Sequence, residues 1–223
     1  MADITIADVE RAVRTTAATV LRNEQYFSNL DGLAGDGDFG TSLATGFRVI
    51  DAELPNLDKS AIGAMLLKIS MLVSKHVGGS SGPIWGTGFM KAAAVSKGKD
   101  SVTLAEVAAM LGAAIDGIQA RGGAKLGDKT LLDALIPVHG VLEAHRETGD
   151  GTAALKEAAD VAERSIDETR ELIAHRGRAS QVGERSSGTP DPGIVAIATI
   201  LHHWCGEWGV ERSATVAEVV KAA

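Results

Sequence analysis

The sequence predicts an all-α fold, and three observations lead to this prediction. Apolar residues recur at intervals of three and four over most of the chain, which places them on one face of a helix. Helix start signals precede several of these segments. Strict alternation of apolar and polar residues, which is typical of a half-buried strand, is not found. The pattern therefore favours eight or nine helices joined by loops.

Most of the expected helices have a recognisable beginning. Thr5–Asp8 is a variant of the capping box, and Thr103–Glu106 is a complete one. Asp191-Pro192 places an N-cap residue before a proline at the first helical position. We expect Ser60 and Asp128 to cap two more helices. The remaining helices are expected at 41–52, at 83–96 and from Thr152, and Thr215–Glu218 is expected to cap a short tail helix.

Composition bounds the class of protein. A chain of 223 residues with 45% apolar and 23% charged residues is long enough to bury its own core, and we expect one domain, 1–223. The net charge of −7 argues against a nucleic-acid partner and against a polybasic membrane contact. A single cysteine, Cys205, excludes an internal disulfide framework and a cysteine-rich zinc site. A cytoplasmic protein without a membrane span is the simplest expectation.

Four glycine-rich loops interrupt the helical pattern, at 31–41, 77–88, 121–130 and 177–193. Glycine permits backbone conformations that other residues avoid and allows the backbone to approach a ligand closely. If the helices run alternately up and down, every second loop lies at the same end of the molecule. The spacing of the four loops fits this condition, so we expect them at one end.

The first loop carries three carboxylates within eight residues, Asp31, Asp36 and Asp38. A bound cation reduces the repulsion among such carboxylates. A ligand set made only of oxygen atoms favours Mg²⁺, Mn²⁺ or Ca²⁺. The spacing does not match an EF-hand, because Thr41 and Phe47 stand where glycine and glutamate are required. The alternative is a solvated acidic turn in which Asp36 caps the next helix.

The other loops offer groups that suit phosphate. Gly78–Gly82 precedes a helix start, where backbone N–H groups and hydroxyls bind anions, although an ordinary turn explains the same residues. The segment 122–130 is not a Walker A motif, because Asp128 intrudes before the lysine and no strand precedes it. Cations in or beside these loops suit phosphate binding or are ordinary surface charges: Lys129, Arg176, Arg178 and Arg185.

Five motifs in this order resemble the nucleotide-binding L subunit of dihydroxyacetone kinases, which is also the C-terminal half of single-chain ATP-dependent enzymes. They read GDGDFGTSLATGF, GGSSGPIWGTGF, RGGAKLGDKTLLDALIPV and GRASQVGERSSGTPDPG, the last of which contains both the GRAS loop and the DPG turn. The resemblance covers about residues 5–207. The resemblance implies a closed barrel of eight antiparallel helices with the nucleotide at one rim. It also implies a kinase subunit that works with a separate ketose-binding subunit and binds ATP or ADP.

The resemblance assigns the site residue by residue. Asp31, Asp36 and Asp38 match the ligands of two Mg²⁺ ions that bridge the nucleotide phosphates, and Arg178 matches an arginine near the nucleotide. The matches for phosphate contacts are Gly40, Thr41, Ser42, Ser80 and Ser81. Gly122 and Leu131 match positions that line the adenine and ribose pocket. The turn that closes the site is matched by Asp191, Pro192 and Gly193.

One position departs from the family. Phosphotransferase-system L subunits commonly carry a histidine where this chain has Phe39, which favours ATP over a phosphoprotein as the donor. The partner chain is expected to select the ketose, which is dihydroxyacetone or a relative such as erythrulose. The sequence does not predict whether the chain associates with itself. A Mg²⁺-dependent phosphohydrolase and a nucleotide-sensing module are the alternative functions.

Overall fold

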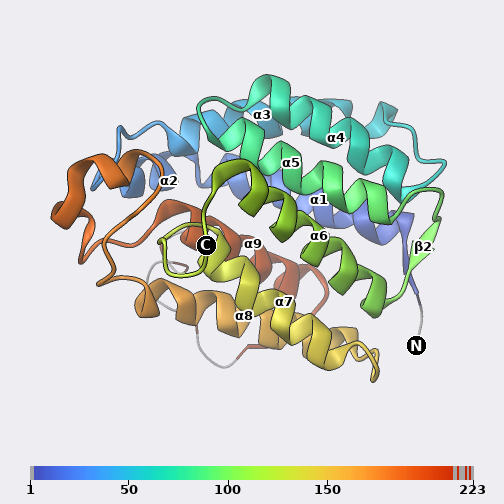
Figure 1. Ribbon diagram of the computed structural model, residues 1–223. Helices are drawn as coiled ribbons and strands as arrows, with labels where there is room; N and C mark the ends of the chain where they lie inside the picture. Colours follow the sequence, from blue (N-terminus) through green and yellow to red (C-terminus); the bar gives the residue numbers. More distant parts are fainter. Residues whose placement is uncertain (1–2, 213–214, 216–218, 220, 222–223) are drawn as a thin grey trace.

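The computed structural model describes residues 3–212, 215, 219 and 221, and this part of the chain is mainly helical, as the sequence predicts (Figure 1). The helices and strands, in chain order, are β1 (Ile4–Thr5), α1 (Ile6–Arg22), α2 (Glu24–Asp31), α3 (Phe39–Glu53), η1 (Leu54–Asn56), α4 (Ile62–His76), α5 (Ser81–Val95), β2 (Ser101–Val102), α6 (Leu104–Gly122), α7 (Leu132–His145), α8 (Gly151–Glu168), η2 (Arg178–Ser186) and α9 (Pro192–Glu207).

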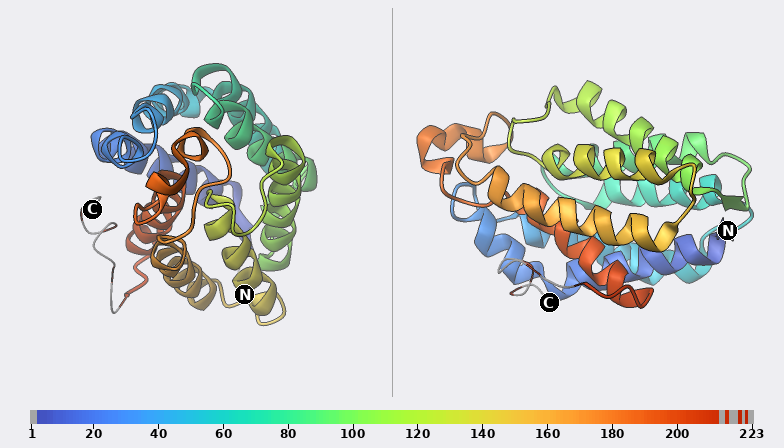
Figure 2. Two further views of the ribbon diagram at one scale, coloured as in Figure 1. Left: turned by 60° about the vertical axis from the view of Figure 1, so that its left-hand side comes forward. Right: turned by 90° about the horizontal axis from the view of Figure 1, so that it is seen from below.

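The long helices pack side by side around a common core. Each contacts the next in the order α1, α3, α4, α5, α6, α7, α8, α9, and α9 returns to contact α1. The end-on view in Figure 2 shows this arrangement, with the short α2 lying against α3 and α9. Many of the largest fully buried side chains come from α2, α3, α4, α7, α8 and α9: Phe27, Phe47, Leu43, Ile50, Ile62, Met65, Ile69, Leu132, Ile166 and Ile194.

The strongest start signals in the sequence are confirmed. The hydroxyl of Thr5 accepts the backbone N–H of Asp8, and the Asp8 carboxylate accepts that of Thr5 at 2.9 Å. Thr103 and Glu106 form the same reciprocal pair at the start of α6. Asp191 caps α9 by accepting the N–H of Ile194 at 2.9 Å, with proline following. These caps satisfy N–H groups that have no partner within their helix.

Two expected caps are wrong. Ser60 does not cap α4. The first N–H group of this helix, on Ile62, donates to the carbonyl of Lys99 at 2.7 Å. Asp128 does not cap α7, which begins four residues later, at Leu132. There the backbone N–H of Thr130 donates to the carboxylate of Asp133 at 2.8 Å, one half of a capping box. The Thr-x-x-Asp spacing that signals this arrangement is present in the sequence.

Besides the three-residue η1, three features of the structure have no counterpart among the expected elements. The first is α2, whose eight residues are too few to show a helical period clearly. The second is the η2 segment inside the last glycine-rich loop. The third is an antiparallel pair of two-residue strands, in which Ile4 lies opposite Val102. The helix expected from Thr215 to Glu218 falls mainly outside the described residues.

The fold places α2, the start of α3 and the η2 segment at one end of the molecule and the strand pair at the other (Figure 1). The glycine-rich loops at 77–88 and 121–130 contact segments at the end that holds α2 and η2. Among the described residues, no helix combines the length and the apolar character that crossing a membrane requires.

The packing of α4 against α5 depends on Gly63. A Cβ atom at this position would lie 2.7–2.8 Å from three backbone atoms, the carbonyl oxygens of Ala93 and Ser96 and the Cα of Lys97. Backbone atoms cannot move aside as a side chain does, so a larger residue forces the two helices apart. Gly140, on the exposed side of α7, is the opposite case, because a Cβ there would have no atom within 4 Å.

We therefore expect opposite effects from one substitution at these two positions. Gly63→Ala lowers the free energy of unfolding by about 1–3 kcal/mol, because it overpacks the helix pair. Gly140→Ala raises it by up to about 1 kcal/mol, because alanine favours the helix. Urea denaturation of both variants checks the prediction, and equal effects would contradict the close packing at Gly63.

Candidate functional site

The three carboxylates predicted to bind metal come together at the junction of α2 and α3. Asp31 is the last residue of α2, Asp38 directly precedes α3, and Asp36 lies in the turn between them. One ligand oxygen from each lies within 4.8 Å of the other two. Asp31 is partly buried and the other two are exposed, so the cluster opens to solvent. It is a group of hard oxygen ligands of the kind that Mg²⁺ uses together with substrate phosphates.

The turn is built around the Asp31 side chain. Its carboxylate accepts the backbone N–H groups of Asp38, at 3.0 Å, and Phe39, at 3.3 Å. A Cβ at Gly35 would lie 2.2 Å from the Asp31 carboxylate, so only glycine lets the turn close this tightly. The alternative that Asp36 caps the next helix is not observed, because Asp38 occupies the N-cap position of α3.

The cluster is electrostatically strained without a cation. Partial burial, together with repulsion from Asp36 and Asp31, raises the pKa of Asp38 above its ordinary value. Arg178 forms an ion pair with the cluster, in which its Nε lies 2.9 Å from Asp36 Oδ2. Arg178 is the first residue of η2, so this pair links the first glycine-rich loop to the last. The arginine predicted from the sequence thus stands at the carboxylates.

The predicted phosphate residues at the start of α3 have different roles. Gly40 is a packing residue, because a Cβ there would lie 1.9 Å from the carbonyl oxygen of Glu24. The N–H of Thr41 donates to the hydroxyl of Ser28 at 3.1 Å. The hydroxyl of Ser42 faces the second loop, 2.8 Å from the position that a Cβ of Gly78 would occupy. Ser28 was not predicted from the sequence, since its role depends on the unexpected helix α2.

The second loop ends in a free helix start. Ser80 is the N-cap residue of α5, and its hydroxyl makes no capping hydrogen bond. Ser81 is the first helical residue and is partly buried, whereas Ser80 is exposed. Gly79 adopts the left-handed backbone conformation, with φ of +59°. The result is an accessible helix N-terminus with two hydroxyls beside the start of α3, which suits an anion.

The third and fourth loops also meet. A Cβ at Gly122 would lie 3.0 Å from Cδ1 of Ile84, so the end of α6 packs on the start of α5. Leu131 lies against Gly193: the Cβ of Leu131 is 3.4 Å from the position that a Cβ of Gly193 would occupy. Arg176 donates to the carbonyl of Gly123 at 2.6 Å. All predicted site segments therefore lie at connected positions of the same end of the fold.

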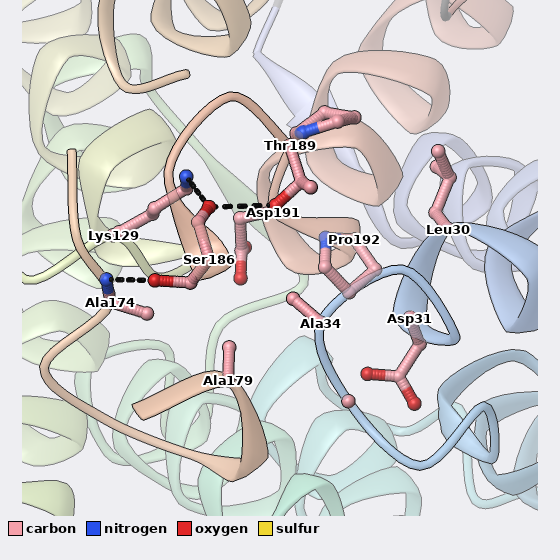
Figure 3. A pocket seen from close by; sticks show the side chains of 12 residues that line it. Leu30, Asp31, Ala34, Lys129, Ala174, Ala179, Ser186, Thr189, Asp191 and Pro192 are labelled. Carbon is pink, nitrogen blue, oxygen red and sulfur yellow. Dashed lines mark hydrogen bonds between the residues drawn. The ribbon is translucent and has the colours of Figure 1, made fainter. Parts of the chain in front are cut away.

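Asp191 lies at a small cavity of about 10 Å³ between the first and last loops, with Asp31, Lys129 and Pro192 among its lining residues (Figure 3). This volume holds about one water. Burial raises the pKa of Asp191 to about 7, although the hydrogen bond from Ile194 opposes the rise. The residue is therefore both the cap of α9 and part of the wall behind the carboxylate cluster.

The other candidate cations, Lys129, Arg176 and Arg185, have no described ion pair with the carboxylate cluster. Lys129 does not face a ligand: it is buried, and its ammonium group donates to three backbone carbonyls. Arg176 Nε lies 3.5 Å from the buried carboxylate of Asp128. Asp128 thus forms an ion pair and does not cap α7. No described hydrogen bond or ion pair places Arg185 at the cluster. Of the four cations predicted from the sequence, Arg178 alone has a described ion pair with the cluster.

The fold and the site define a mainly helical protein that brings an acidic cluster, an arginine and a free helix N-terminus to one end. Comparison with known proteins extends this description. The family model described as the DAK2 domain matches residues 33–206. The ADP-binding subunit DhaL of the PEP-dependent dihydroxyacetone kinase of Escherichia coli is 36% identical over 181 residues, 79% of this chain and 85% of that subunit.

Longer relatives match as well. The L-erythrulose 1-kinase of Mycolicibacterium smegmatis is 36% identical over 182 residues, 80% of this chain but 32% of the enzyme. The crystal structure of the dihydroxyacetone kinase of C. freundii in complex with AMP-PNP and Mg²⁺ superposes with a TM-score of 0.72 and 26% identity. That match covers 90% of this chain and about a third, 34%, of the enzyme. The chain belongs to the DAK2 domain family, and its relatives are named as kinases or kinase subunits.

The buried carboxyl group of Asp191 predicts a pH dependence of stability. A carboxyl whose pKa rises from 3.8 in the unfolded chain to about 7 in the folded one stabilises the fold fully only below pH 3.8. That stability is lost as the pH rises toward 7. Asp191→Asn keeps a good helix cap and removes the ionisation.

We expect Asp191→Asn to gain stability relative to the parent protein as the pH rises. The gain between about pH 5 and pH 8 is at least about 1 kcal/mol, which corresponds to roughly one unit of pKa shift. Denaturant unfolding of both proteins in metal-free buffer at the two pH values measures it. Parallel pH profiles would contradict the raised pKa.

Proposed function

We propose that the protein is the nucleotide-binding subunit of a kinase that phosphorylates a short ketose. The observation that carries the proposal is the cluster of Asp31, Asp36 and Asp38, with oxygen atoms within 4.8 Å and Arg178 at its side. Transfer of a phosphoryl group depends mainly on positioning and on neutralising charge, and this end of the fold offers groups for both. The names of the relatives support the same reaction class.

In this proposal the three aspartates hold two Mg²⁺ ions. Bound Mg²⁺ neutralises the phosphate charge and keeps the reacting oxygens in line. The proposal is supported by the donor set, which contains only carboxylate oxygens, and by the raised pKa of Asp38, which a cation would reverse. The C. freundii enzyme, which this chain resembles, was solved with AMP-PNP and Mg²⁺.

The chain's own groups then bind the rest of the nucleotide. Thr41 and Ser42, which follow the packing residue Gly40, and the free helix start at Ser80 and Ser81 donate to phosphate oxygens. Arg178 offsets the negative charge that develops on the transferred group. Farther from the cluster, Gly122 and Leu131 line the base and ribose, while Asp191, Pro192 and Gly193 close the site from behind.

The acceptor is proposed to come from another chain. The E. coli relative is named as a subunit, and the longer relatives carry about twice as much additional sequence, since this chain spans 32% of the erythrulose kinase. We infer that a separate ketose-binding subunit docks at the nucleotide end. Dihydroxyacetone and erythrulose both occur in the names of the relatives, and the choice between them belongs to that partner.

The position of Phe39 bears on the phosphoryl donor. Its ring packs edge-on against Phe27, with centroids 6.4 Å apart, so it belongs to the apolar contact between α2 and α3. Its side chain, unlike a histidine, offers no polar group to the neighbouring carboxylates. This supports ATP as the direct donor, although relatives with similar identity include PEP-dependent subunits.

The architecture completes the proposal. The cyclic order of helix contacts supports a closed barrel of eight antiparallel helices, with α2 as an addition at the nucleotide end. We take 1–223 as one domain, because the helix circuit closes only when α9 meets α1. We also propose a cytoplasmic location, in which the buried thiol of Cys205 stays reduced.

The metal assignment predicts a specific loss of binding. Removing one carboxylate from the cluster in Asp36→Asn takes away a ligand that the ions need, so the affinity for Mg²⁺-ADP falls at least about 100-fold while the helices stay folded. Calorimetric titration with and without Mg²⁺ measures the effect. Asp116→Asn, which neutralises an exposed carboxylate on α6, is the matched control and binds as the parent protein does. Unchanged affinity in Asp36→Asn would contradict the assignment.

The proposed division of labour predicts that transfer requires two chains. Mixed with a ketose-binding subunit and Mg²⁺-ATP, the protein forms ketose phosphate, and neither chain does so alone. Product formation is followed by ³¹P NMR with dihydroxyacetone and with erythrulose. Rapid ATP hydrolysis without the partner would instead indicate a phosphohydrolase. Tight Mg²⁺-ADP binding without transfer to either ketose would indicate a nucleotide-sensing module.

A further inference from the structure

Lys129 is the most unusual charged residue outside the carboxylate cluster. It is 3% exposed, although lysine is rarely buried. Its backbone has φ of +61°, and it is the only residue other than glycine with positive φ in the part of the chain that the structure describes. Such a conformation is unfavourable for a lysine and persists only where surrounding contacts enforce it.

The contacts of the ammonium group show what enforces this conformation. Lys129 Nζ donates to the carbonyl oxygens of Arg170 at 2.8 Å, Leu172 at 2.9 Å and Ser186 at 2.6 Å. All three protons of the group are therefore used, and the charge is solvated by backbone dipoles instead of water. The acceptors lie 41 to 57 residues away in the sequence, so these bonds are long-range ties.

The three acceptors sit at the two ends of one loop. Arg170 and Leu172 lie where the loop leaves α8, and Ser186 lies where η2 ends. Two further hydrogen bonds close the same base: Gly188 N–H to the carbonyl of Arg170 at 2.9 Å, and Ala174 N–H to the hydroxyl of Ser186 at 2.9 Å. Figure 3 shows Lys129 and Ala174 meeting at Ser186.

The loop that is closed in this way carries Arg178. The guanidinium group extends from the loop to Asp36 at 2.9 Å, and the side chain is 63% exposed. An exposed arginine has many rotamers, so its position at the cluster depends on where the loop backbone is held. The hydrogen bonds at the base of the loop hold this backbone, and the ammonium group of Lys129 donates three of them.

We propose that Lys129 is a positioning residue, whose ammonium group closes the base of the 170–188 loop and thereby places Arg178 at the carboxylate cluster. The inference rests on the proposed function, since Arg178 is taken to act on a bound nucleotide. Lys129 itself does not touch the phosphates. This distinguishes it from the lysine of a phosphate-binding loop, which the spacing around residue 129 superficially suggests.

The first arm of the test needs no nucleotide. Lys129→Met keeps the length of the side chain but removes one donor from each of three carbonyls. The carbonyl of Leu172 then has no described donor, whereas those of Arg170 and Ser186 keep the N–H of Gly188 and the hydroxyl of Thr189. Hydrogen exchange of the free protein is expected to speed up at least about tenfold at the amides of Ala174 and Gly188, with exchange in α1 and α4 unchanged. Lys68→Met, which removes an exposed lysine from α4, is the control for charge and leaves both amides protected. Unchanged protection in Lys129→Met would overturn the proposal.

The second arm is a double-mutant cycle on Mg²⁺-ADP affinity. Arg178→Ala and Lys129→Met each weaken binding about tenfold, and the double variant is no weaker than the weaker single one, because both changes remove the same contact. Losses that multiply would overturn the positioning role. Should Lys129→Met fail to fold, Lys129→Gln, which keeps two donors, is measured in its place. If the parent protein does not bind Mg²⁺-ADP, the proposed function fails, and the exchange measurements alone decide the role of Lys129.

Discussion

Repulsion among three carboxylates is the constraint on which the proposed nucleotide-binding end of this protein depends. Asp31, Asp36 and Asp38 are held with oxygens within 4.8 Å, and partial burial with this repulsion raises the pKa of Asp38. The fold holds them there by fixing the Asp31 side chain with two backbone N–H groups and by using glycine where the turn is tightest. A site strained in this way is stabilised by cations, which links its shape to its proposed chemistry.

The rest of the fold supports that cluster through helix ends. Caps at Thr5, Thr103 and Asp191 fix where helices begin, and close glycine contacts at Gly40 and Gly63 fix how they pack. The groups proposed to bind phosphate then lie at helix N-termini, where backbone N–H groups have no partner within the helix. The long loop after α8 brings Arg178 into an ion pair with Asp36 of the cluster.

Much of this arrangement can be predicted from the sequence, for identifiable reasons. Capping boxes and the Asp-Pro start are local signals, so they predict the starts of three helices correctly. The three aspartates can be found because their spacing is short, and Arg178 because its motif resembles a family. The roles of Lys129 and Ser28 were not predicted, since both depend on partners distant in sequence or on the short helix α2. Asp128 was misassigned because its contact with Arg176 is also long-range.

The central claim is that the carboxylate cluster binds a metal ion that also contacts nucleotide phosphate. Electron paramagnetic resonance of Mn²⁺, used in place of Mg²⁺, tests both contacts in one sample with ADP. The account predicts protein-bound Mn²⁺ with hyperfine coupling to ³¹P, and loss of that signal in Asp36→Asn but not in Asp116→Asn. Mn²⁺-ADP that stays free of the protein, or that Asp36→Asn binds as tightly and with the same coupling as the parent protein, would contradict the metal assignment.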